Sequence, residues 1–341
     1  MKRSILIALA LCLSGSLSFA QGIVNAELNT APMAVNPAFT GMFNGCVRVN
    51  TFYSSRWEDA MVPFVSMGVS ADMPVYTNKK GNYLAAGLQL HKDMAGDGNL
   101  SNFNSILSVS YHKIFRKSND SNNSHSSDLA IGVEAGYDQC SIDVGQIYFG
   151  NFWYLSYPYY NYNYYLPPPG QSIQYNLGIG NDISYYPVNV GICFSQAAGP
   201  KFNYTVGVAV YNLSQPKTAY EQFQYNYAGL QRSCIAEIGA VWKITSRLTL
   251  KPEILYQSIP SVWNFIAGND FEYNVSKHPA LPNTTSVFAG AWLRTGDLLM
   301  ATAGVAFKRL RIGIAYDYHV MPVSIPGDRN EGFIINRYQF Y

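Results

Sequence analysis

The chain's serines and five histidines could do acid–base or nucleophilic chemistry. His112 stands two residues after Ser110 and four after Ser108, so an extended strand would carry all three side chains on one face. A serine esterase or protease site can be assembled from side chains on separate strands, and these three are the candidates for it. The simpler interpretation, which we favour, is that they solvate the polar face of a sheet.

No sequence motif strengthens the enzymatic interpretation. The chain has no G-x-S-x-G elbow, no phosphate-binding P-loop and no H-E-x-x-H zinc motif. The histidines fall in different segments without the spacing of metal ligands. They are His91, His112, His125, His278 and His319. We therefore predict a protein that is not an enzyme and that uses neither a metal nor a cofactor.

Five cysteines are present, and none belongs to a C-x-x-C pair of the kind that zinc and redox sites use. Cys12 lies within an apolar leader and follows Leu11, where a lipidated cysteine would follow a small residue. The other four are Cys46, Cys140, Cys193 and Cys234. One or two disulfides would be allowed in an oxidising compartment, and free thiols that are buried or face lipid are an equally good interpretation.

The first 20 residues have the three parts of a secretory signal peptide. Lys2 and Arg3 form a basic start, residues 5–13 are apolar, and residues 18–20 give a small-x-small cleavage site. We expect export through the Sec pathway and a mature chain that begins at Gln21. Past this leader no run of about 18 apolar residues occurs, so a mature chain that crosses a membrane would cross it as strands.

Charge and composition restrict the class of partner. Removing Lys2 and Arg3 from the 23 basic residues leaves 21, equal to the 21 acidic residues, because the leader holds neither Asp nor Glu. A neutral mature chain gives no reason to expect nucleic acid as a partner. With 27 Tyr, 18 Phe and only 13% charged residues, the composition suits the aromatic girdles of a membrane barrel and also a secreted β-sandwich. The 321 residues after the leader (341 − 20) show no evident linker, and they would require two or more sandwich domains.

Residues 310–320 alternate strictly, with apolar or aromatic side chains at even positions and charged, small or polar ones at odd positions. Alternating strands of about ten residues cross an outer membrane with one face toward lipid and the other toward a polar lumen. The pattern recurs in fourteen segments, and an even number returns the chain to the side from which it entered. We predict an all-β fold, a transmembrane antiparallel outer-membrane β-barrel of 14 strands.

The predicted strands are residues 45–56, 64–76, 83–92, 103–115, 128–140, 182–195, 202–212, 232–245, 247–259, 262–275, 286–294, 298–307, 310–320 and 332–341. Pro252 interrupts one of them, and since proline cannot donate to the ladder, we expect a bulge or a local break there. The organisation that follows is a signal peptide at 1–20, a periplasmic N-terminal segment at 21–43 and the barrel at 44–341.

The predicted surface loop at 152–170 is rich in tyrosine and also contains Trp153. Rigid amphipathic rings at this density suit a surface that contacts protein or glycan, for which Trp153, Tyr159, Tyr160 and Tyr162 are the candidates. Packing on the rim of the barrel, or membership of an interfacial girdle, explains these rings equally well.

Short motifs are spread along the mature chain. Residues 36–41 read N-P-A-F-T-G, Arg56 and Trp57 end the first predicted strand, residues 66–74 read S-M-G-V-S-A-D-M-P, and residues 312–317 read I-G-I-A-Y-D. Together these elements resemble the PorP/SprF family of outer-membrane proteins of Bacteroidetes. Pro252 is similar to the family's pattern too, whereas the tyrosine-rich loop and the cysteines depart from it.

The resemblance implies a fourteen-stranded barrel that belongs to the type IX secretion system and its gliding motility machinery. It implies that the protein supports export or surface retention of a large adhesin through the adhesin's C-terminal domain. The implied partners are outer-membrane lipid, a secreted surface protein or its C-terminal domain, and periplasmic type IX components, including peptidoglycan-associated ones. A small-solute channel or transporter is the alternative function.

Two sets of site residues follow from the sequence. Asn36, Pro37 and Gly41 are candidates for partner contact at the barrel entrance, since Asn caps turns and Pro fixes φ, and plugging of the periplasmic mouth explains them equally well. The second set consists of residues that we expect to form structural contacts in the lumen or at its rim. They are Arg48, Arg56, Trp57, Asp72, Asp93 and Asp317.

Overall fold

The structure is a computed structural model that describes residues 31–56, 62–96, 99–116, 126–142, 182–216, 230–259, 262–276, 284–295, 298–319 and 336–340. The predicted signal peptide lies outside the described residues. So do Trp57 and the four candidates of the tyrosine-rich loop, Trp153, Tyr159, Tyr160 and Tyr162.

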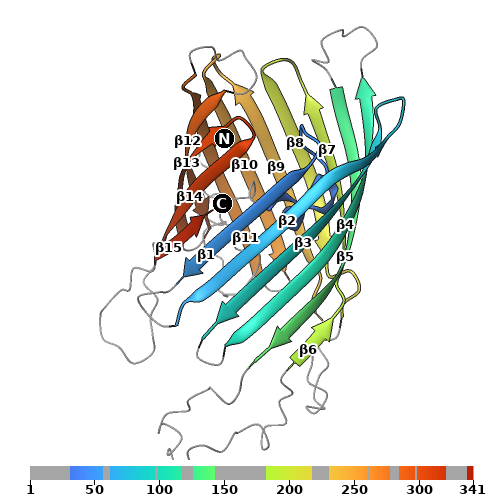
Figure 1. Cartoon of the computed structure of the whole chain (residues 1–341), viewed down its shortest axis with the longest axis vertical. Coiled ribbons are helices and arrows are strands. Elements are labelled where there is room, and N and C mark those ends of the chain that lie inside the picture. Colours follow the sequence, from blue (N-terminus) through green and yellow to red (C-terminus); the bar gives the residue numbers. More distant parts are fainter. Residues whose placement is uncertain are drawn as a thin grey trace, which may run out of the picture.

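The described strands form one antiparallel sheet (Figure 1). The first eight are β1 (Arg48–Arg56), β2 (Phe64–Thr77), β3 (Tyr83–Ala95), β4 (Leu100–Arg116), β5 (Ser126–Ser141), β6 (Asp182–Tyr185), β7 (Val188–Ala197) and β8 (Phe202–Tyr211). The others are β9 (Ser233–Lys243), β10 (Leu248–Ile259), β11 (Val262–Asn274), β12 (Thr285–Arg294), β13 (Leu298–Phe307), β14 (Leu310–His319) and β15 (Asn336–Phe340). Two short helices, α2 (Pro32–Val35) and η1 (Pro37–Phe39), precede β1.

The sheet closes on itself. β1 pairs with β2 on one side and with β15 on the other, and β4 pairs with β5, so the described strands form a ring. β6 and β7 both pair with β5 and are separated only by Tyr186 and Pro187, where proline interrupts the ladder. Counted as one interrupted strand, they give the described part of the chain fourteen strands, which confirms the predicted antiparallel outer-membrane barrel.

The longest stretches between strands, residues 142–181, 212–232 and 320–335, all separate strands at one end of the barrel, although connections of two to four residues occur at both ends. Brief turns join β2 to β3, β7 to β8, β9 to β10 and β13 to β14, the last of them made by Lys308 and Arg309 alone. We call this the short-turn end, which is uppermost in Figure 1. β1 and β14 both begin at this end, because Arg48 lies beside the end of β2 and Leu310 follows the Lys308–Arg309 turn. In outer-membrane barrels the short turns face the periplasm.

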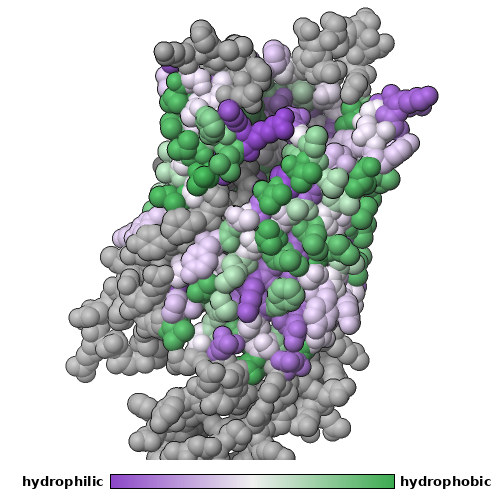
Figure 2. Space-filling view, viewed as in Figure 1, coloured by the Kyte–Doolittle hydropathy of each residue, from purple (hydrophilic) through white to green (hydrophobic). Residues whose placement is uncertain are grey.

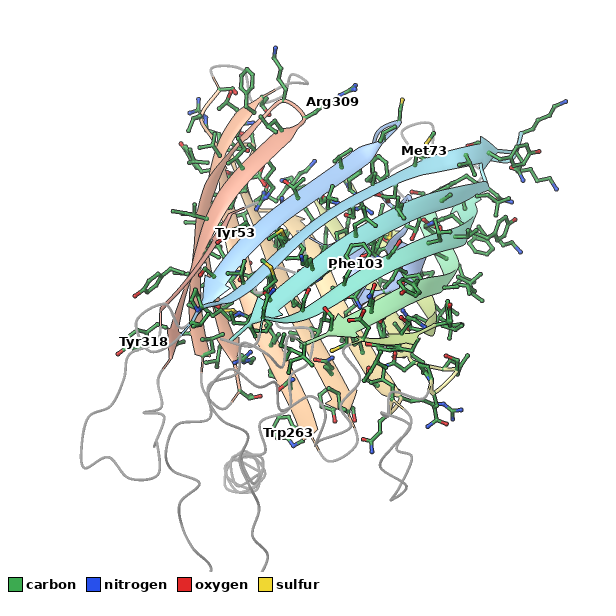
Figure 3. All side chains as sticks on the ribbon, turned by 60° about the horizontal axis from the view of Figure 1, so that its bottom comes forward. Tyr53, Met73, Phe103, Trp263, Arg309 and Tyr318 are labelled. Atoms are coloured by element: carbon green, nitrogen blue, oxygen red, sulfur yellow. The ribbon has the colours of Figure 1, made fainter. Side chains whose placement is uncertain are left out.

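Side chains alternate between the two faces of the wall as the sequence pattern predicts. Leu107 and Val109 of β4 are 64% and 53% exposed, whereas Ser108 and Ser110 beside them are each 1% exposed. Large apolar side chains therefore stand outside and small polar ones inside, the reverse of a water-soluble protein. Figure 2 shows hydrophobic residues gathered over the strands of this face, and Figure 3 labels exposed rings such as Tyr53 and Phe103.

No helix among the described residues is long and apolar enough to cross a membrane.

Pro252 produces a break rather than a bulge. The ladder between β10 and β9 pairs Thr249 and Leu250, omits Lys251 and Pro252, and resumes at Glu253 in the same register. The ladder of β10 with β11 runs through Pro252 without a shift. Pro252 therefore costs β10 strand pairs on one side only, toward β9, and the barrel still closes.

Candidate functional site

Part of the chain lies inside the barrel. We call residues 31–43 the plug segment, because η1 within it lies against β4, β5 and β7 and most of its residues are buried before the chain enters β1. The sequence analysis places this stretch in a periplasmic N-terminal segment and leaves open whether residues 36–41 plug the mouth of the barrel; the described residues 31–43 lie within the wall. Asn36, Ala38 and Thr40 are completely buried.

The local fold of the plug segment follows from two prolines and one asparagine. Pro32 begins α2 and Pro37 begins η1, at first-turn positions where the missing N–H costs nothing. Asn36 ends the first helix and caps the second, its Oδ1 accepting a hydrogen bond from the Ala38 N–H at 2.9 Å. Gly41 then reverses the chain with a φ of +74°, a conformation that favours glycine.

Asn36 also fastens the plug segment to the wall. Its Nδ2 donates to Glu237 Oε1 of β9 at 2.8 Å and to the Ile192 carbonyl of β7 at 3.2 Å. Glu237 is only 2% exposed, and its Oε2 has no hydrogen-bond partner among the described residues. Asn36 therefore supplies a bond to a buried carboxylate that would otherwise lack one.

The carbonyl oxygen of Thr40 is held by the residues that the sequence raised as a hydrolase candidate. Ser110 Oγ donates to it at 2.6 Å, and His112 Nε2 lies 2.8 Å from it. The Thr40 hydroxyl lies 2.5 Å from Ser108 Oγ. All three wall residues are at most 1% exposed, so the plug segment covers them.

The same cluster has the connectivity of a Ser-His-Asp triad. Ser110 Oγ lies 3.0 Å from His112 Nε2, and His112 Nδ1 lies 2.9 Å from Asp128 Oδ2. A carbonyl oxygen only accepts hydrogen bonds, so the approach of His112 Nε2 to Thr40 requires a proton on the nitrogen that a general base needs free. The geometry therefore holds the plug segment and does not activate Ser110.

The ion pair between Arg48 of β1 and Asp72 of β2 binds the end of the plug segment. Arg48 makes a two-pronged contact with Asp72, Nε to Oδ1 at 2.9 Å and Nη2 to Oδ2 at 2.7 Å. The Gly41 N–H donates to the same carboxylate at 2.6 Å, and Arg48 Nη2 donates to the Phe39 carbonyl at 2.9 Å. Arg48 and Asp72, both expected in the lumen or at its rim, thus meet and bind the end of the plug segment.

Inward-facing glycines make room for the segment. A Cβ at Gly132 of β5 would collide with the Pro37 backbone, and one at Gly191 of β7 would collide with the Asn36 side chain. A Cβ at Gly207 of β8 would meet Glu237 and Asn36. The sequence shows these glycines on the polar faces of three neighbouring strands, but nothing local relates them to residues 36 and 37.

The other residues predicted to lie in the lumen or at its rim make different contacts from those of the plug segment. Asp93 accepts from Ser66 Oγ at 2.6 Å and lies 2.7 Å from His91 Nε2. The Arg56 guanidinium stacks 5.4 Å from the centre of the Phe64 ring. Asp317 is 1% exposed, inside the barrel.

The sequence analysis did not predict a cluster of charged side chains on β10, β11 and β14. Asp270 is completely buried and lies 3.0 Å from Arg311 Nη2, while Glu272 lies 2.6 Å from Lys251 Nζ and 3.3 Å from Arg311 Nη1. Thr302 Oγ1 donates to Asp270 at 3.0 Å. Cross-strand alternation places these residues inward, but only the register of β10 to β14 shows which of them pair.

The plug segment also borders a cavity of about 470 Å³ at the short-turn end. Gly41, Met42 and Phe43 line one side of it, and Tyr83 and Asp128 belong to the wall. Val35, deeper inside, packs in an apolar cluster with residues of β8 to β14.

The described residues contain no group of three or more His, Cys, Asp or Glu side chains that could hold a metal ion. The four cysteines that the structure describes, Cys46, Cys140, Cys193 and Cys234, are all free. Of the two interpretations left open by the sequence, the structure has the free thiols.

The fold and its interior define an outer-membrane β-barrel whose lumen contains part of its own chain. The sequence model described as "Type IX secretion system membrane protein PorP/SprF" matches residues 18–326. The chain therefore belongs to the PorP/SprF family, and it is a membrane component of the type IX secretion system. Comparison with curated protein sequences gives no match.

The solved structures that this chain resembles are distant in sequence. CymD, a monoaromatic hydrocarbon channel, is 9% identical with a TM-score of 0.46, and 96% of each chain is covered. The toluene transporter TodX of Pseudomonas putida is 8% identical with a TM-score of 0.44, covering 96% of this chain and 93% of TodX. CdiB from Escherichia coli is 10% identical with a TM-score of 0.44; 91% of this chain is covered, and the chain spans 57% of CdiB.

Proposed function

We propose that this barrel is a non-enzymatic accessory of type IX secretion and gliding that supports export or surface attachment of a large secreted adhesin through the adhesin's C-terminal domain. The single observation that supports this best is the plug segment. Its hydrogen bonds reach strands β2, β4, β7, β8 and β9, the β8 bond running from Tyr211 to the Ala34 carbonyl at 2.9 Å. A lumen occupied in this way suits an anchor and docking platform better than a pore.

In this proposal the signal peptide directs Sec export, the barrel anchors the protein in outer-membrane lipid, and connections at the end opposite the short turns hold the secreted client. In the proposal, the candidate client contacts include Trp153, Tyr159, Tyr160 and Tyr162, which follow β5 in the sequence and lie outside the described residues. Periplasmic type IX components, including peptidoglycan-associated ones, meet the short-turn end. Asn36, Pro37 and Gly41 would contact a partner only after leaving the wall, so their first role is to seat the plug segment.

The test is co-purification combined with surface display. An affinity-tagged chain would be isolated from native outer membranes, and secreted proteins would be followed on cells that lack the gene. We expect a surface protein to co-purify through its C-terminal domain and to disappear from the surface of the deletion strain. Unchanged surface display together with no co-purifying secreted protein would contradict the proposal.

A small-solute channel is the second candidate, and the charged wall of Lys251, Asp270, Glu272 and Arg311 favours it, because such walls solvate ions and small solutes. Under this alternative the plug segment must move aside during transport. Conductance across planar bilayers separates the two functions.

A further inference from the structure

The exposed charges of the barrel are separated by sign. Of the ten exposed Lys and Arg side chains in the described part of the chain, eight lie at the short-turn end and two, Lys92 and Arg232, lie toward the opposite end. We call the eight residues at the short-turn end the basic collar. They are Lys79, Lys80, Lys113, Lys201, Lys243, Arg247, Lys308 and Arg309.

No exposed acidic side chain balances the basic collar among the described residues. Only Asp182, at the opposite end, is exposed, while the other described Asp and Glu side chains are buried or half-buried. None of the eight cations belongs to a described ion pair. The sequence of the remaining connections at this end, 117–125 and 277–283, adds two Lys and one Asp, and residues 21–30 hold a single Glu. This end is therefore basic wherever those residues lie.

The basic collar surrounds the barrel. Its members stand on the turn from β2 to β3, on β4, on the turns from β7 to β8 and from β9 to β10, and on the turn from β13 to β14, which are spread along the order of the sheet. Figure 3 labels one of them, Arg309, at the end of the molecule opposite Trp263. A ring of charge suits a ligand that surrounds the protein, whereas contact with a single partner protein would need charge on one side only.

Exposed aromatic rings show the depth of the basic collar in the membrane. Lys113 Nζ lies 5.2 Å from the centre of the Phe115 ring, and Lys308 Nζ lies 5.1 Å from the centre of the Phe307 ring. The two rings are 46% and 50% exposed. Aromatic girdles occupy the boundary between hydrocarbon and water, and lysine side chains reach from it toward the head groups. The basic collar therefore stands at the level of the lipid head groups of the periplasmic leaflet.

The cations are closest together at the two turns that flank β9. Lys201 precedes β8, Lys243 ends β9 and Arg247 precedes β10, and the Lys243 N–H donates to the Lys201 carbonyl at 2.8 Å. Beside them the rings of Phe202 and Trp242 meet edge to face, with centres 6.5 Å apart. Three cations next to two exposed rings can hold a phosphate head group while the acyl chain lies against the rings.

We propose that the basic collar binds anionic phospholipids of the periplasmic leaflet, and that Lys201, Lys243 and Arg247 form its principal site. Lys and Arg side chains only donate hydrogen bonds, and they form their strongest ones with phosphate oxygens. Basic clusters beside a bilayer attract anionic lipids, whereas zwitterionic lipids carry no net charge to attract. The inference does not rest on the proposed secretion role, because it concerns the lipid around the barrel and not the client.

Quenching of tryptophan fluorescence by brominated lipids tests the site where it is proposed. Trp242 is 50% exposed at the basic collar, and Trp263 is 45% exposed at the opposite end. Full-length chains would keep the buried Trp292 and one of these two, with phenylalanine at the other tryptophans. The vesicles would contain phosphatidylglycerol and phosphatidylcholine, with bromine on one lipid at a time. We expect phosphatidylglycerol to quench Trp242 more than about twofold better than phosphatidylcholine, and both to quench Trp263 equally.

Two pairs of substitutions provide the matched control. Lys201→Gln with Arg247→Gln removes two charges at the site, and Lys92→Gln with Arg232→Gln removes the same residue types at the opposite end. We expect only the first pair to abolish the lipid preference at Trp242. Salt at about 1 M should abolish it too, because the Debye length is then about 3 Å. Equal quenching of Trp242 by both lipids, or a preference that survives the first pair, would overturn the proposal.

Native mass spectrometry of the chain with all its tryptophans gives a second measurement that does not depend on their replacement. From mixed vesicles, the wild type should retain phosphatidylglycerol over phosphatidylcholine, and Lys201→Gln with Arg247→Gln should retain less. An acidic periplasmic protein that co-purifies only with the wild type, without any lipid preference, would assign the basic collar to a protein partner and overturn the proposal.

Discussion

Asn36 connects the local turn to the distant wall. It accepts from the Ala38 N–H and donates to Glu237, which is 201 residues away in the chain. The first bond follows from the Asn-Pro sequence, since asparagine caps turns. The second required the closed barrel, because no local pattern relates residue 36 to residue 237. Sequence reasoning therefore predicted the turn and left open whether it plugs the barrel or meets a partner.

Asn36→Ala removes the cap and leaves the buried Glu237 carboxylate without its donor. A lost bond of this kind costs about 1–3 kcal/mol. We expect the heat-modifiable gel shift of the purified barrel to occur at a lower temperature. Asn264→Ala is the control, since its only described side-chain bond is a long one of 3.5 Å to Gln257. Equal shifts for the two variants would show that Asn36 has no special role.

Gly191→Ala places a methyl group against the Asn36 side chain, and we expect it to displace the plug segment. Gly239→Ala is the matched control, because the nearest atom to its new Cβ is a Glu253 carbon at 3.7 Å, an ordinary contact. Limited proteolysis in detergent measures this displacement, because a displaced plug segment exposes the N-terminal residues to cleavage. The account predicts cleavage in the first variant and protection in the second, and protection in both would contradict the assigned contacts.

The native Ser110 should be unreactive. Its hydroxyl donates to the Thr40 carbonyl, and His112 beside it cannot act as a base while Nε2 faces the same oxygen. A fluorophosphonate probe should therefore leave the folded barrel unlabelled. Labelling of the wild type that Ser110→Ala abolishes would revive the hydrolase interpretation.

At the scale of elements, the strands were the part that the sequence predicted best. Most observed boundaries lie within about three residues of the predicted ones, because a wall with lipid on one face and polar space on the other imposes a period of two. Pro252 shows the limit: it predicted a disturbance, but only the ladders show that β9 and not β11 loses pairs. Of the predicted last strand at 332–341, the structure describes Asn336–Phe340 as β15.

Tethering the plug segment separates the two candidate functions. Thr40→Cys with Ser108→Cys replaces two hydroxyls that lie 2.5 Å apart, so oxidation should fix the segment to β4. An accessory that works with its lumen occupied should still display its client on the cell surface when oxidised. Loss of surface display on oxidation, restored by a reductant, would show that the segment has to move.

The whole molecule is a closed, lipid-facing wall around an interior that its own chain partly fills. Membership of the type IX secretion family places it among membrane components of that system. The occupied lumen connects this membership with the proposed role as an anchor rather than a pore. Composition and periodicity predicted the wall. The position of the plug segment inside it depends on glycines and polar residues contributed by strands far apart in sequence.

Single-channel conductance of the purified full chain in planar bilayers tests the central claim most directly. We predict no steady pore current for the wild type, and porin-like steps once Gly191→Ala has displaced the plug segment. Gly239→Ala should stay as silent as the wild type. A wild-type barrel that conducts as freely as Gly191→Ala would contradict the account and favour the solute channel.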